Sequence, residues 1–190
     1  MANYNLFKKS IEQAEGGYQN FAEDKGNYNS LGERVGTNRG ISARFFEDIM
    51  GFPPSIEDMK AISKEEAHIL FKNEFWDKVK ADSINNQAVA ETIVDHAINA
   101  GVGAAGKIVQ ETLNKYFNKT LVVDRSIGSV TVQAINSVDS KKLFEKISIA
   151  RLEDYKTKPT YKRFGHAWRT RVYDLAKKFG VEIKKKVPSL

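Results

Sequence analysis

The chain has 190 residues, of which 41% are hydrophobic and 28% are charged, a composition typical of a soluble globular protein with its own core. It contains no cysteine, which excludes disulfides, thiolate catalysis and cysteine-based zinc sites and favours a reducing compartment. No segment approaches the roughly 20 apolar residues of a membrane span, and the first ten residues lack the apolar core of a signal peptide. We therefore expect a protein that is cytoplasmic when synthesised.

The net charge of +6 is distributed unevenly along the chain. Residues 1–95 hold 11 Lys and Arg against 16 Asp and Glu, whereas residues 96–190 hold 19 against 8. The two halves therefore have net charges of −5 and +11. A basic half is able to bind a polyanion such as nucleic acid, an acidic membrane surface or a phosphate-bearing envelope polymer, but it is equally compatible with a solvated helical surface.

The first predicted helix covers residues near 4–15, where apolar side chains recur at helical spacing. Gly16 and Gly17 follow it as a helix stop. Residues 20–42 are rich in Gly, Asn and Asp, which predicts a loop with a short, irregular β-hairpin. The apolar anchors expected for this hairpin are Tyr28, Leu31, Val35 and Ile41.

Helical periodicity dominates the chain beyond Ser42, which is predicted to cap a helix that ends at Gly51. Ser63 and Glu66 form a predicted capping box at the start of another helix. Residues near 86–100 predict the most buried helix of the protein. Further helices are predicted at residues 108–117, from Ser129, from Asp139 or Ser140 to Pro159, and at 165–179. The sequence therefore predicts a mainly α protein.

Several familiar motifs do not fit this pattern. The G-x-G-x-x-G match from Gly101 to Gly106 follows a helix, whereas a dinucleotide site requires a preceding strand, so we interpret it as a helix–helix corner. The three histidines lack zinc-hydrolase spacing, and no serine-hydrolase elbow or phosphate-binding loop is present. We expect no metal and no cofactor. The aromatic residues of the basic C-terminal tract are interpreted as core, so nucleic acid is not the expected partner.

Glu15 occupies a position suited to glycosidase chemistry. Glycoside cleavage needs a carboxylic acid that protonates the leaving oxygen and usually a second carboxylate. The dipole at a helix C-terminus disfavours ionisation of a glutamate, although this effect is under about 1 kcal/mol, so burial must supply the rest. Asp24 lies across the predicted turn from Glu15, and Thr37 is placed to hold a water for attack.

These residues resemble the Glu, Asp and Thr set of phage T4-type lysozymes. They are more similar to the N-acetylmuramidases of glycoside hydrolase family 108, often labelled secretion-activating proteins. The Glu-Gly-Gly-aromatic signature of that family appears at residues 15–18, and its Thr-x-x-Gly-Ile element appears at residues 37–41. Further matches are the pair Trp76-Asp77 and the helical set Asp95, Asn99 and Gly101.

The resemblance extends into the second half of the chain. Residues 124–131 resemble the start of the family's predicted peptidoglycan-binding segment, and its closing motif matches Gly165, Trp168, Arg171 and Val172. We expect Trp168 and Arg171 to tie the C-terminal helix to the body of the protein. Asp95 and Asn99 are as well suited to cross-linking helices as to contacting sugar.

The resemblance implies a mainly α, lysozyme-like fold with a small irregular β-hairpin lobe and additional C-terminal helices. Residues 1–100 would form the catalytic part, and residues 101–190 the helical extension. The implied reaction is hydrolysis of the β-1,4 bond between N-acetylmuramic acid and N-acetylglucosamine in peptidoglycan. Glu15 would be the general acid, with Asp24 and Thr37 as catalytic partners. The residues expected to bind substrate are Gly17, Tyr18, Arg39, Gly40, Trp76, Asp95 and Asn99.

The sequence also departs from the family pattern. The loop from Asp24 to Thr37 is longer than usual, and Arg39 replaces an aromatic residue, so Glu23 and Glu33 are alternative second carboxylates. Three other functions stay open: a non-catalytic peptidoglycan-binding protein, a lytic transglycosylase and a basic nucleic-acid binder. The expected partners are peptidoglycan strands and a holin or other export system that brings the enzyme to the periplasm or cell wall.

Overall fold

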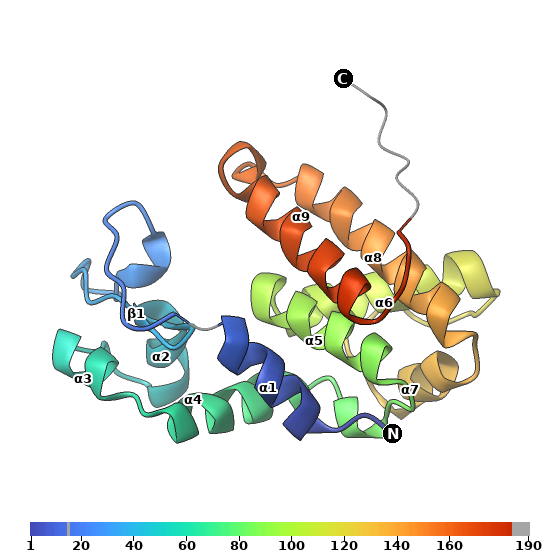
Figure 1. Cartoon of the computed structure of the whole chain (residues 1–190), viewed down its shortest axis with the longest axis horizontal. Coiled ribbons are helices and arrows are strands. Elements are labelled where there is room, and N and C mark those ends of the chain that lie inside the picture. The colour runs from blue at the N-terminus through green and yellow to red at the C-terminus, as the bar shows by residue number, and fades with distance from the viewer. Residues whose placement is uncertain (15, 184–190) are drawn as a thin grey trace. The chain divides into compact units, whose positions relative to one another are not determined.

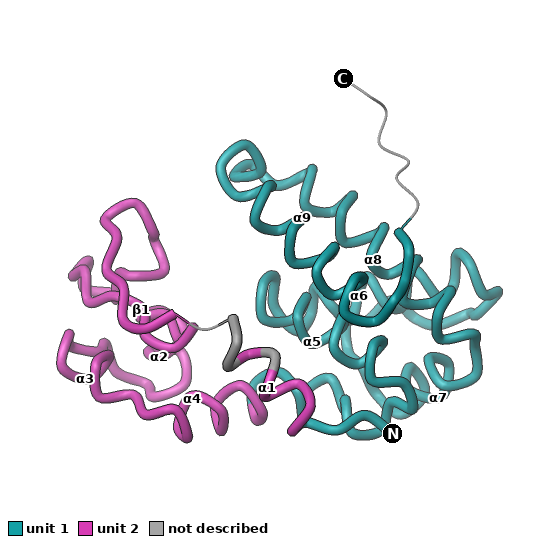
Figure 2. The backbone as a smooth tube through the Cα atoms, viewed as in Figure 1, with its two compact units in different colours: residues 1–4, 74–190 teal, residues 5–73 magenta. Residues whose placement is uncertain are grey.

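The protein is mainly α-helical in its computed structural model, which describes residues 1–14 and 16–183 (Figure 1). This part of the chain contains nine α-helices and one two-stranded antiparallel sheet, as the sequence predicts. The chain divides into two compact units, residues 5–73 and residues 1–4 with 74–190 (Figure 2). Within the described residues, no helix has both the length and the apolar composition required to cross a membrane.

The unit of residues 5–73 is built from short helices around a small hairpin. Its elements are α1 (Tyr4–Ala14, of which Tyr4 belongs to the other unit), the 3-10 turn η1 (Lys25–Asn27), β1 (Thr37–Asn38), β2 (Ile41–Ser42), α2 (Ala43–Met50), α3 (Ile56–Ala61) and α4 (Lys64–Phe71). The Ser42 hydroxyl accepts a hydrogen bond from the backbone N–H of Phe45, and Gly51 ends α2 in the left-handed conformation. Ser63 and Glu66 form the predicted capping box of α4. Both helix starts are therefore determined by local sequence.

The hairpin turns through Arg39 and Gly40. Both residues have positive φ, 49° and 75°, the conformation of the two-residue turns that match the twist of antiparallel strands. The predicted anchors Val35 and Ile41 are buried, but Leu31 is 68% exposed, so its prediction as an anchor is wrong. Leu31 lies in a tight turn whose backbone N–H groups bond to Asn29, and this turn directs the leucine outward.

The second unit is a bundle arranged around one buried helix. Its helices are α5 (Gln87–Ala100), α6 (Val102–Phe117), α7 (Ser129–Asn136), α8 (Ser140–Lys156) and α9 (Tyr161–Lys178). Helix α5 packs against α6, α8 and α9. Its apolar side chains are almost completely buried on several faces, at Val89, Ala90, Ile93, Val94 and Ala97. The prediction that this helix is the most buried is confirmed.

The packing of α5 bears on the expected division of the chain near residue 100. Helices α5 and α6 lie on opposite sides of that residue in sequence and pack directly against each other. The boundary between the two compact units therefore falls near residue 73 of the sequence and not at residue 100. The division into a catalytic part (residues 1–100) and a helical extension (residues 101–190) is based on the charge asymmetry and the motifs. It stays a prediction.

The glycine-rich segment between α5 and α6 is a helix–helix corner. Gly101 has a φ of 92° and separates the two helices. A Cβ on Gly106 would lie only 2.3 Å from the carbonyl oxygen of Arg125, whereas a Cβ on Gly103 would meet only the Arg125 side chain, at 3.6 Å or more. Gly106 thus allows the loop before α7 to cross α6 at close range, which explains the motif without a nucleotide.

We expect Gly106→Ala and Gly103→Ala to change stability in opposite directions. At Gly106 the new methyl group meets backbone that cannot rotate away, and overpacking of this kind costs about 1–3 kcal/mol. At Gly103 the methyl has space, and replacing a helical glycine by alanine stabilises by about 0.5–1 kcal/mol. Urea unfolding followed by circular dichroism measures both changes, and equal stability of the two variants would contradict the close crossing.

Candidate functional site

The candidate site is formed by the loop of residues 16–42, whose backbone is held by a close crossing. The backbone N–H groups of Gln19 and Thr37 each donate to the carbonyl oxygen of the other, at 2.8 Å in both directions. Gly36 precedes Thr37 with a φ of 92°, and a Cβ there would come within 2.7 Å of the Gln19 carbonyl oxygen. The glycine therefore allows Thr37 to lie beside Gln19.

Asn27 is the centre of the hydrogen-bond network in this loop and is fully buried. Its Oδ1 accepts hydrogen bonds from Thr37 Oγ1 at 2.7 Å and from Gln19 Nε2 at 3.1 Å. Its Nδ2 donates to Gln19 Oε1 at 3.0 Å and to the Phe21 carbonyl oxygen at 2.9 Å. Every hydrogen-bonding position of the amide is thus satisfied, and Asn27 determines where Gln19 and Thr37 point.

Asp24 joins the same network as the N-cap of η1. Its Oδ1 accepts a hydrogen bond from the backbone N–H of Gly26 at 2.9 Å, and Gln19 Nε2 lies 3.4 Å from its Oδ2. The sequence-predicted residues Asp24 and Thr37 are therefore brought together on either side of the Gln19–Asn27 pair. We refer to Gln19, Asp24, Asn27 and Thr37 as the Asn27 cluster.

The cluster has a definite hydrogen-bond polarity. Because the Thr37 hydroxyl donates its proton to Asn27, its lone pairs accept any further hydrogen bond. Asp24 is half-buried, and a carboxylate oxygen accepts hydrogen bonds but donates none. A water molecule between Thr37 and Asp24 would donate one hydrogen bond to each of them. The lone pairs on its oxygen would then be free to attack an electrophile.

The remaining predicted carboxylates do not belong to this cluster. Glu15, the predicted general acid, lies outside the described residues and directly follows Ala14, the last residue of α1. Glu33 accepts a hydrogen bond from Asn29 Nδ2 at 2.9 Å, which fixes the 29–33 turn. Glu23 is exposed. Of the three candidates for the second carboxylate, only Asp24 is linked to Thr37.

Four predicted substrate-binding residues lie in the same loop. The Tyr18 hydroxyl donates to the Val35 carbonyl oxygen at 3.1 Å, so Tyr18 supports the loop. Arg39 Nε donates to the carbonyl oxygen of Ile62 at 3.0 Å, and Gly40 forms the hairpin turn. Gly17 is exposed, with space around it for a side chain. The roles visible for Tyr18, Arg39 and Gly40 are structural.

Trp76 belongs to the second unit and is fully buried. Its indole N–H donates to Asp82 Oδ1 at 2.7 Å, and its ring packs edge-on against Tyr4 at a centroid distance of 5.4 Å. Because no part of the ring is exposed, Trp76 is a core residue, which corrects the expectation that it binds substrate.

Asp95 also lies in the second unit, where it pairs with two arginines. Arg151, which is fully buried, donates to Asp95 Oδ2, and Arg171 donates to Asp95 Oδ1 through both Nε at 3.1 Å and Nη2 at 2.5 Å. Burial favours a higher pKa for Asp95, but the charges of Arg151 and Arg171 outweigh it and hold the pKa below the usual value. Asp95 therefore joins α5 to α8 and α9, and its oxygens are occupied by protein.

Three further residues complete this buried group. Arg151 donates to the Thr92 hydroxyl at 2.9 Å and to the Tyr155 hydroxyl at 3.1 Å. His96 Nδ1 lies 3.3 Å from the Tyr155 hydroxyl. Asn99, the last predicted substrate-binding residue, is half-buried, and within the described residues its Nδ2 has no hydrogen-bond partner.

Sequence reasoning missed Gln19, Asn27 and Arg151. Asn27 follows Gly26 in a loop rich in asparagine, and nothing in that pattern distinguishes it from its neighbours. Arg151 gives a clearer signal, because it continues the buried stripe of Phe144 and Ile147 on α8. A buried cation requires an anionic partner, and Asp95 and Glu91 are the acidic residues of buried helix α5.

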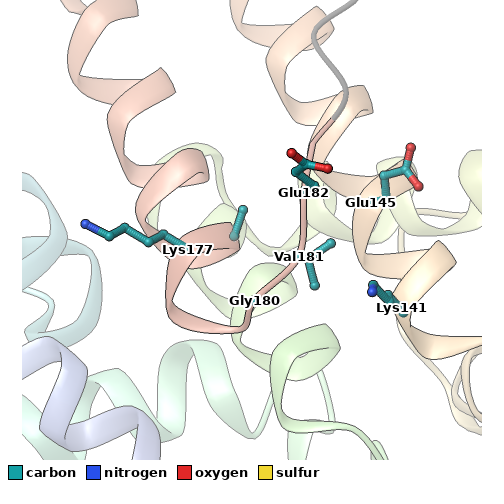
Figure 3. Close-up of a pocket in the computed structure, with 7 residues that line it drawn as sticks. Lys141, Glu145, Lys177, Gly180, Val181 and Glu182 are labelled. Atoms are coloured by element: carbon teal, nitrogen blue, oxygen red, sulfur yellow. The ribbon is translucent and has the colours of Figure 1, made fainter.

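One pocket of the second unit is lined by none of these groups. It has a volume of about 500 Å³ and is lined by Lys141 and Glu145 of α8, by the end of α9 and by residues 180–182 (Figure 3). None of the predicted site residues lines it. The candidate site is thus assigned from the Asn27 cluster.

We expect Asn27→Ala to reduce activity by more than its effect on stability explains. Asn29 is a matched control, because it is buried in the same unit and its side chain also makes four hydrogen bonds, but to the 29–33 turn and Pro54. Each substitution leaves buried partners unsatisfied, at a cost of about 1–3 kcal/mol. Turnover of peptidoglycan is compared at a temperature where both variants are folded. If Asn29→Ala loses as much activity as Asn27→Ala, Glu33 rather than Asp24 is supported as the second carboxylate.

His96 predicts a specific acid sensitivity. Burial, followed by the charge of Arg151, lowers the pKa of His96 to about 3, against 6.5 for the unfolded chain. Below pH 6.5 the unfolded state therefore binds a proton that the folded state does not, and the free energy of unfolding falls as pH decreases. This contribution is complete above pH 6.5 and is lost progressively toward pH 3.

Between pH 6.5 and 5 the loss attributable to His96 is about 1.5 kcal/mol. The carboxylates with lowered pKa values, such as Asp95 and Glu66, start from 3.8 and 4.5, so their effect begins at lower pH. We expect His96→Asn to flatten the stability profile between pH 6.5 and 5, measured by urea unfolding. His166→Asn, at an exposed position, serves as the control. An unchanged slope in His96→Asn would contradict a neutral, buried imidazole.

The structure of Brucella abortus SagA resembles this chain with a TM-score of 0.80, at 24% sequence identity, over 96% of this chain and 97% of that one. At this identity the likeness establishes the fold alone, which is the expected mainly α, lysozyme-like fold. No curated protein sequence matches the chain.

The sequence model of the family described as Glycosyl hydrolase 108 matches residues 8–101. The matched segment contains the whole Asn27 cluster, the position of Glu15 and helix α5. Glycoside hydrolases form this family, and peptidoglycan fits it as a substrate. The chain therefore belongs to glycosyl hydrolase family 108.

Proposed function

We propose that this protein is an N-acetylmuramidase that hydrolyses the β-1,4 bond between N-acetylmuramic acid and N-acetylglucosamine in peptidoglycan. The observation that supports this proposal most strongly is the hydrogen-bonded link from Thr37 through Asn27 and Gln19 to Asp24, inside the family-matched segment. Because peptidoglycan lies outside the cytoplasmic membrane, the proposed substrate requires the protein to act in the periplasm or the cell wall.

In the proposed mechanism Glu15 protonates the glycosidic oxygen as the bond to the anomeric carbon breaks. The proposal places Glu15 at the negative end of the α1 dipole, which would favour the protonated acid by under about 1 kcal/mol. Partial burial by substrate would raise its pKa further. The role of Glu15 rests on its sequence position and on the family motif at residues 15–18.

The attacking water is proposed to lie between Asp24 and Thr37. Thr37 accepts one hydrogen bond from the water, because its own proton is donated to Asn27. Asp24 accepts the second proton as the oxygen of the water bonds to the anomeric carbon. Water is thereby added across the glycosidic bond, with one proton taken by Asp24 and one supplied by Glu15. A separately held water of this kind is characteristic of an inverting route.

Substitution of the two acids tests these roles. We expect Glu15→Gln and Asp24→Asn each to lower kcat by about 10²- to 10⁴-fold, the range for removal of a general acid or base. Glu23→Gln and Glu33→Gln are the controls, with kcat close to that of the unmodified protein. Release of reducing ends from purified peptidoglycan measures the rates. Full activity of Glu15→Gln would exclude Glu15 as the acid.

The same assay separates a glycosidase from a non-catalytic peptidoglycan-binding protein, one of the alternatives left open by the sequence. A non-catalytic peptidoglycan-binding protein predicts no release of reducing ends from any variant, together with retention on insoluble peptidoglycan. A glycosidase predicts release that depends on Glu15. Thr37→Val gives a finer test, because it removes the oxygen that holds the water while leaving Asn27 bonded to Gln19, and it should lower kcat more than it raises KM.

A further inference from the structure

One face of helix α9 presents a row of basic side chains to solvent. Lys162, His166, Arg169, Tyr173 and Lys177 are spaced at i, i+4, i+7, i+11 and i+15, so they share one face of the helix. Tyr173 is half-buried and the other four residues are exposed. The row is about 22 Å long at the helical rise of 1.5 Å per residue. We refer to these five residues as the α9 basic stripe.

The face of α9 next to the stripe is packed against the bundle, which determines the direction of the stripe. Val172 and Ala176 are buried, and Trp168 stacks at a tilt on Tyr155 of α8 with a centroid distance of 5.2 Å. Arg171 is held by the ion pair with Asp95. These contacts prevent α9 from rotating to bury its basic face, so the stripe is a permanent surface of the unit.

The cations of the stripe are not neutralised by the protein. Arg171 and Lys178, which flank it, pair with Asp95 and Glu91, whereas among the described residues no carboxylate lies within 4.0 Å of the charged groups of Lys162, Arg169 or Lys177. Asp174 is the sole acidic residue in the α9 sequence. Figure 3 shows the side chain of Lys177 extending away from Glu145 and Glu182.

We propose that the α9 basic stripe is a docking surface for the carboxylates of the peptide-substituted glycan strands of peptidoglycan. This inference rests on the proposed function, which supplies the polymer. Carboxylates on the peptides recur along each strand, and a row of cations about 22 Å long is complementary to such a repeating anion. Arg169 is suited to bidentate carboxylate binding and the lysines to point-charge attraction, while the ring of Tyr173 offers an apolar face to sugar or peptide.

The stripe would keep the enzyme on its insoluble substrate between cleavage events, without contributing to the chemistry. Exposed charge pairs are screened by salt, with a Debye length of about 8 Å at physiological ionic strength. Retention on peptidoglycan should therefore decrease steeply as salt is raised.

A pair of charge-matched variants tests this surface. The stripe variant is K162E/R169E/K177E. The control variant is K64E/K80E/K119E, which reverses three lysines outside the stripe that likewise have no carboxylate within 4.0 Å among the described residues. Both variants have the same formal net charge. They are made in the Glu15→Gln protein, and co-sedimentation is measured with peptidoglycan stripped of phosphate-bearing polymers, across a salt series.

We expect the stripe variant to bind at least about tenfold more weakly at low salt, and the control variant to bind within about threefold of the parent. Equal losses in the two variants would overturn the proposal in favour of a non-local charge effect. Two other outcomes would overturn the proposal in favour of a phosphate ligand. One is binding that occurs only when the phosphate-bearing polymers are left on the peptidoglycan, and the other is binding that a stoichiometric concentration of DNA abolishes. Circular dichroism verifies that each variant is folded. If reversing the three charges unfolds the stripe variant, K162Q/R169Q/K177Q replaces it, and this variant should show a smaller loss of binding in the same direction.

The experiment also distinguishes failure of the docking surface from failure of the proposed enzyme. Cleavage of soluble glycan fragments that lack peptides is measured in proteins that retain Glu15. The stripe variant should cleave these fragments at the parent rate, since its altered residues do not belong to the Asn27 cluster. If no protein cleaves the fragments but the binding difference persists, the muramidase assignment fails and the docking surface stands.

Discussion

The structure depends on the requirement that a buried polar group find a bonding partner for each of its donors and acceptors. Asn27 shows this requirement most clearly, because its side-chain amide is fully buried and bonded at every position. Its partners, Gln19, Phe21 and Thr37, come from segments that would otherwise be an irregular loop. The cost of an unsatisfied buried amide, about 1–3 kcal/mol, is what gives this loop one conformation. The same bonds determine which way the Thr37 hydroxyl points, so the local stability of the loop and the proposed chemistry have a common origin.

The second unit satisfies the same requirement with charge. Arg151 is fully buried on α8 and pairs with Asp95 of α5, which in turn holds Arg171 of α9. Removing one member of a buried ion pair costs about 3–5 kcal/mol because the other charge is left uncompensated. The pairing therefore fixes how the three helices pack, and it also determines that the remaining cations of α9 face solvent. Asp95 and Arg171, which match motifs of the family, thus have a role in helix packing. The same packing leaves the basic stripe exposed.

The parts of the structure that local chemistry determines were predictable from the sequence. Ser42 and Ser63 act as N-caps as expected, and the hairpin forms where glycine and asparagine are concentrated. Helix α9 begins at Tyr161 rather than near residue 165, because Gly165 does not mark the start of the helix but lies inside it and packs against the Tyr161 ring. Leu31 is exposed because a turn held by Asn29 overrides its hydrophobicity.

The roles that depend on distant partners were predictable only in part. Arg171 was expected to tie the C-terminal helix to the body of the protein and does so, but the sequence did not identify Asp95 as its partner. The partner of Asp95 lies 56 residues away in α8, and a second lies 76 residues away in α9. Trp76 is an aromatic residue of the kind that lines sugar-binding clefts, but it is fully buried. Conversely, Asn27 has no distinguishing pattern in the sequence, and its importance is visible only when Asp24 and Thr37 are found on either side of its bond with Gln19.

The identity of the released ends of peptidoglycan tests the central claim most directly. Soluble fragments produced by the unmodified protein would be reduced and analysed by mass spectrometry. Addition of water at the bond proposed here predicts fragments that end in reducing N-acetylmuramic acid. Fragments that end in 1,6-anhydro-N-acetylmuramic acid would identify a lytic transglycosylase, and fragments that end in reducing N-acetylglucosamine would identify a glucosaminidase. Either result would contradict a muramidase in which Asp24 and Thr37 hold the attacking water.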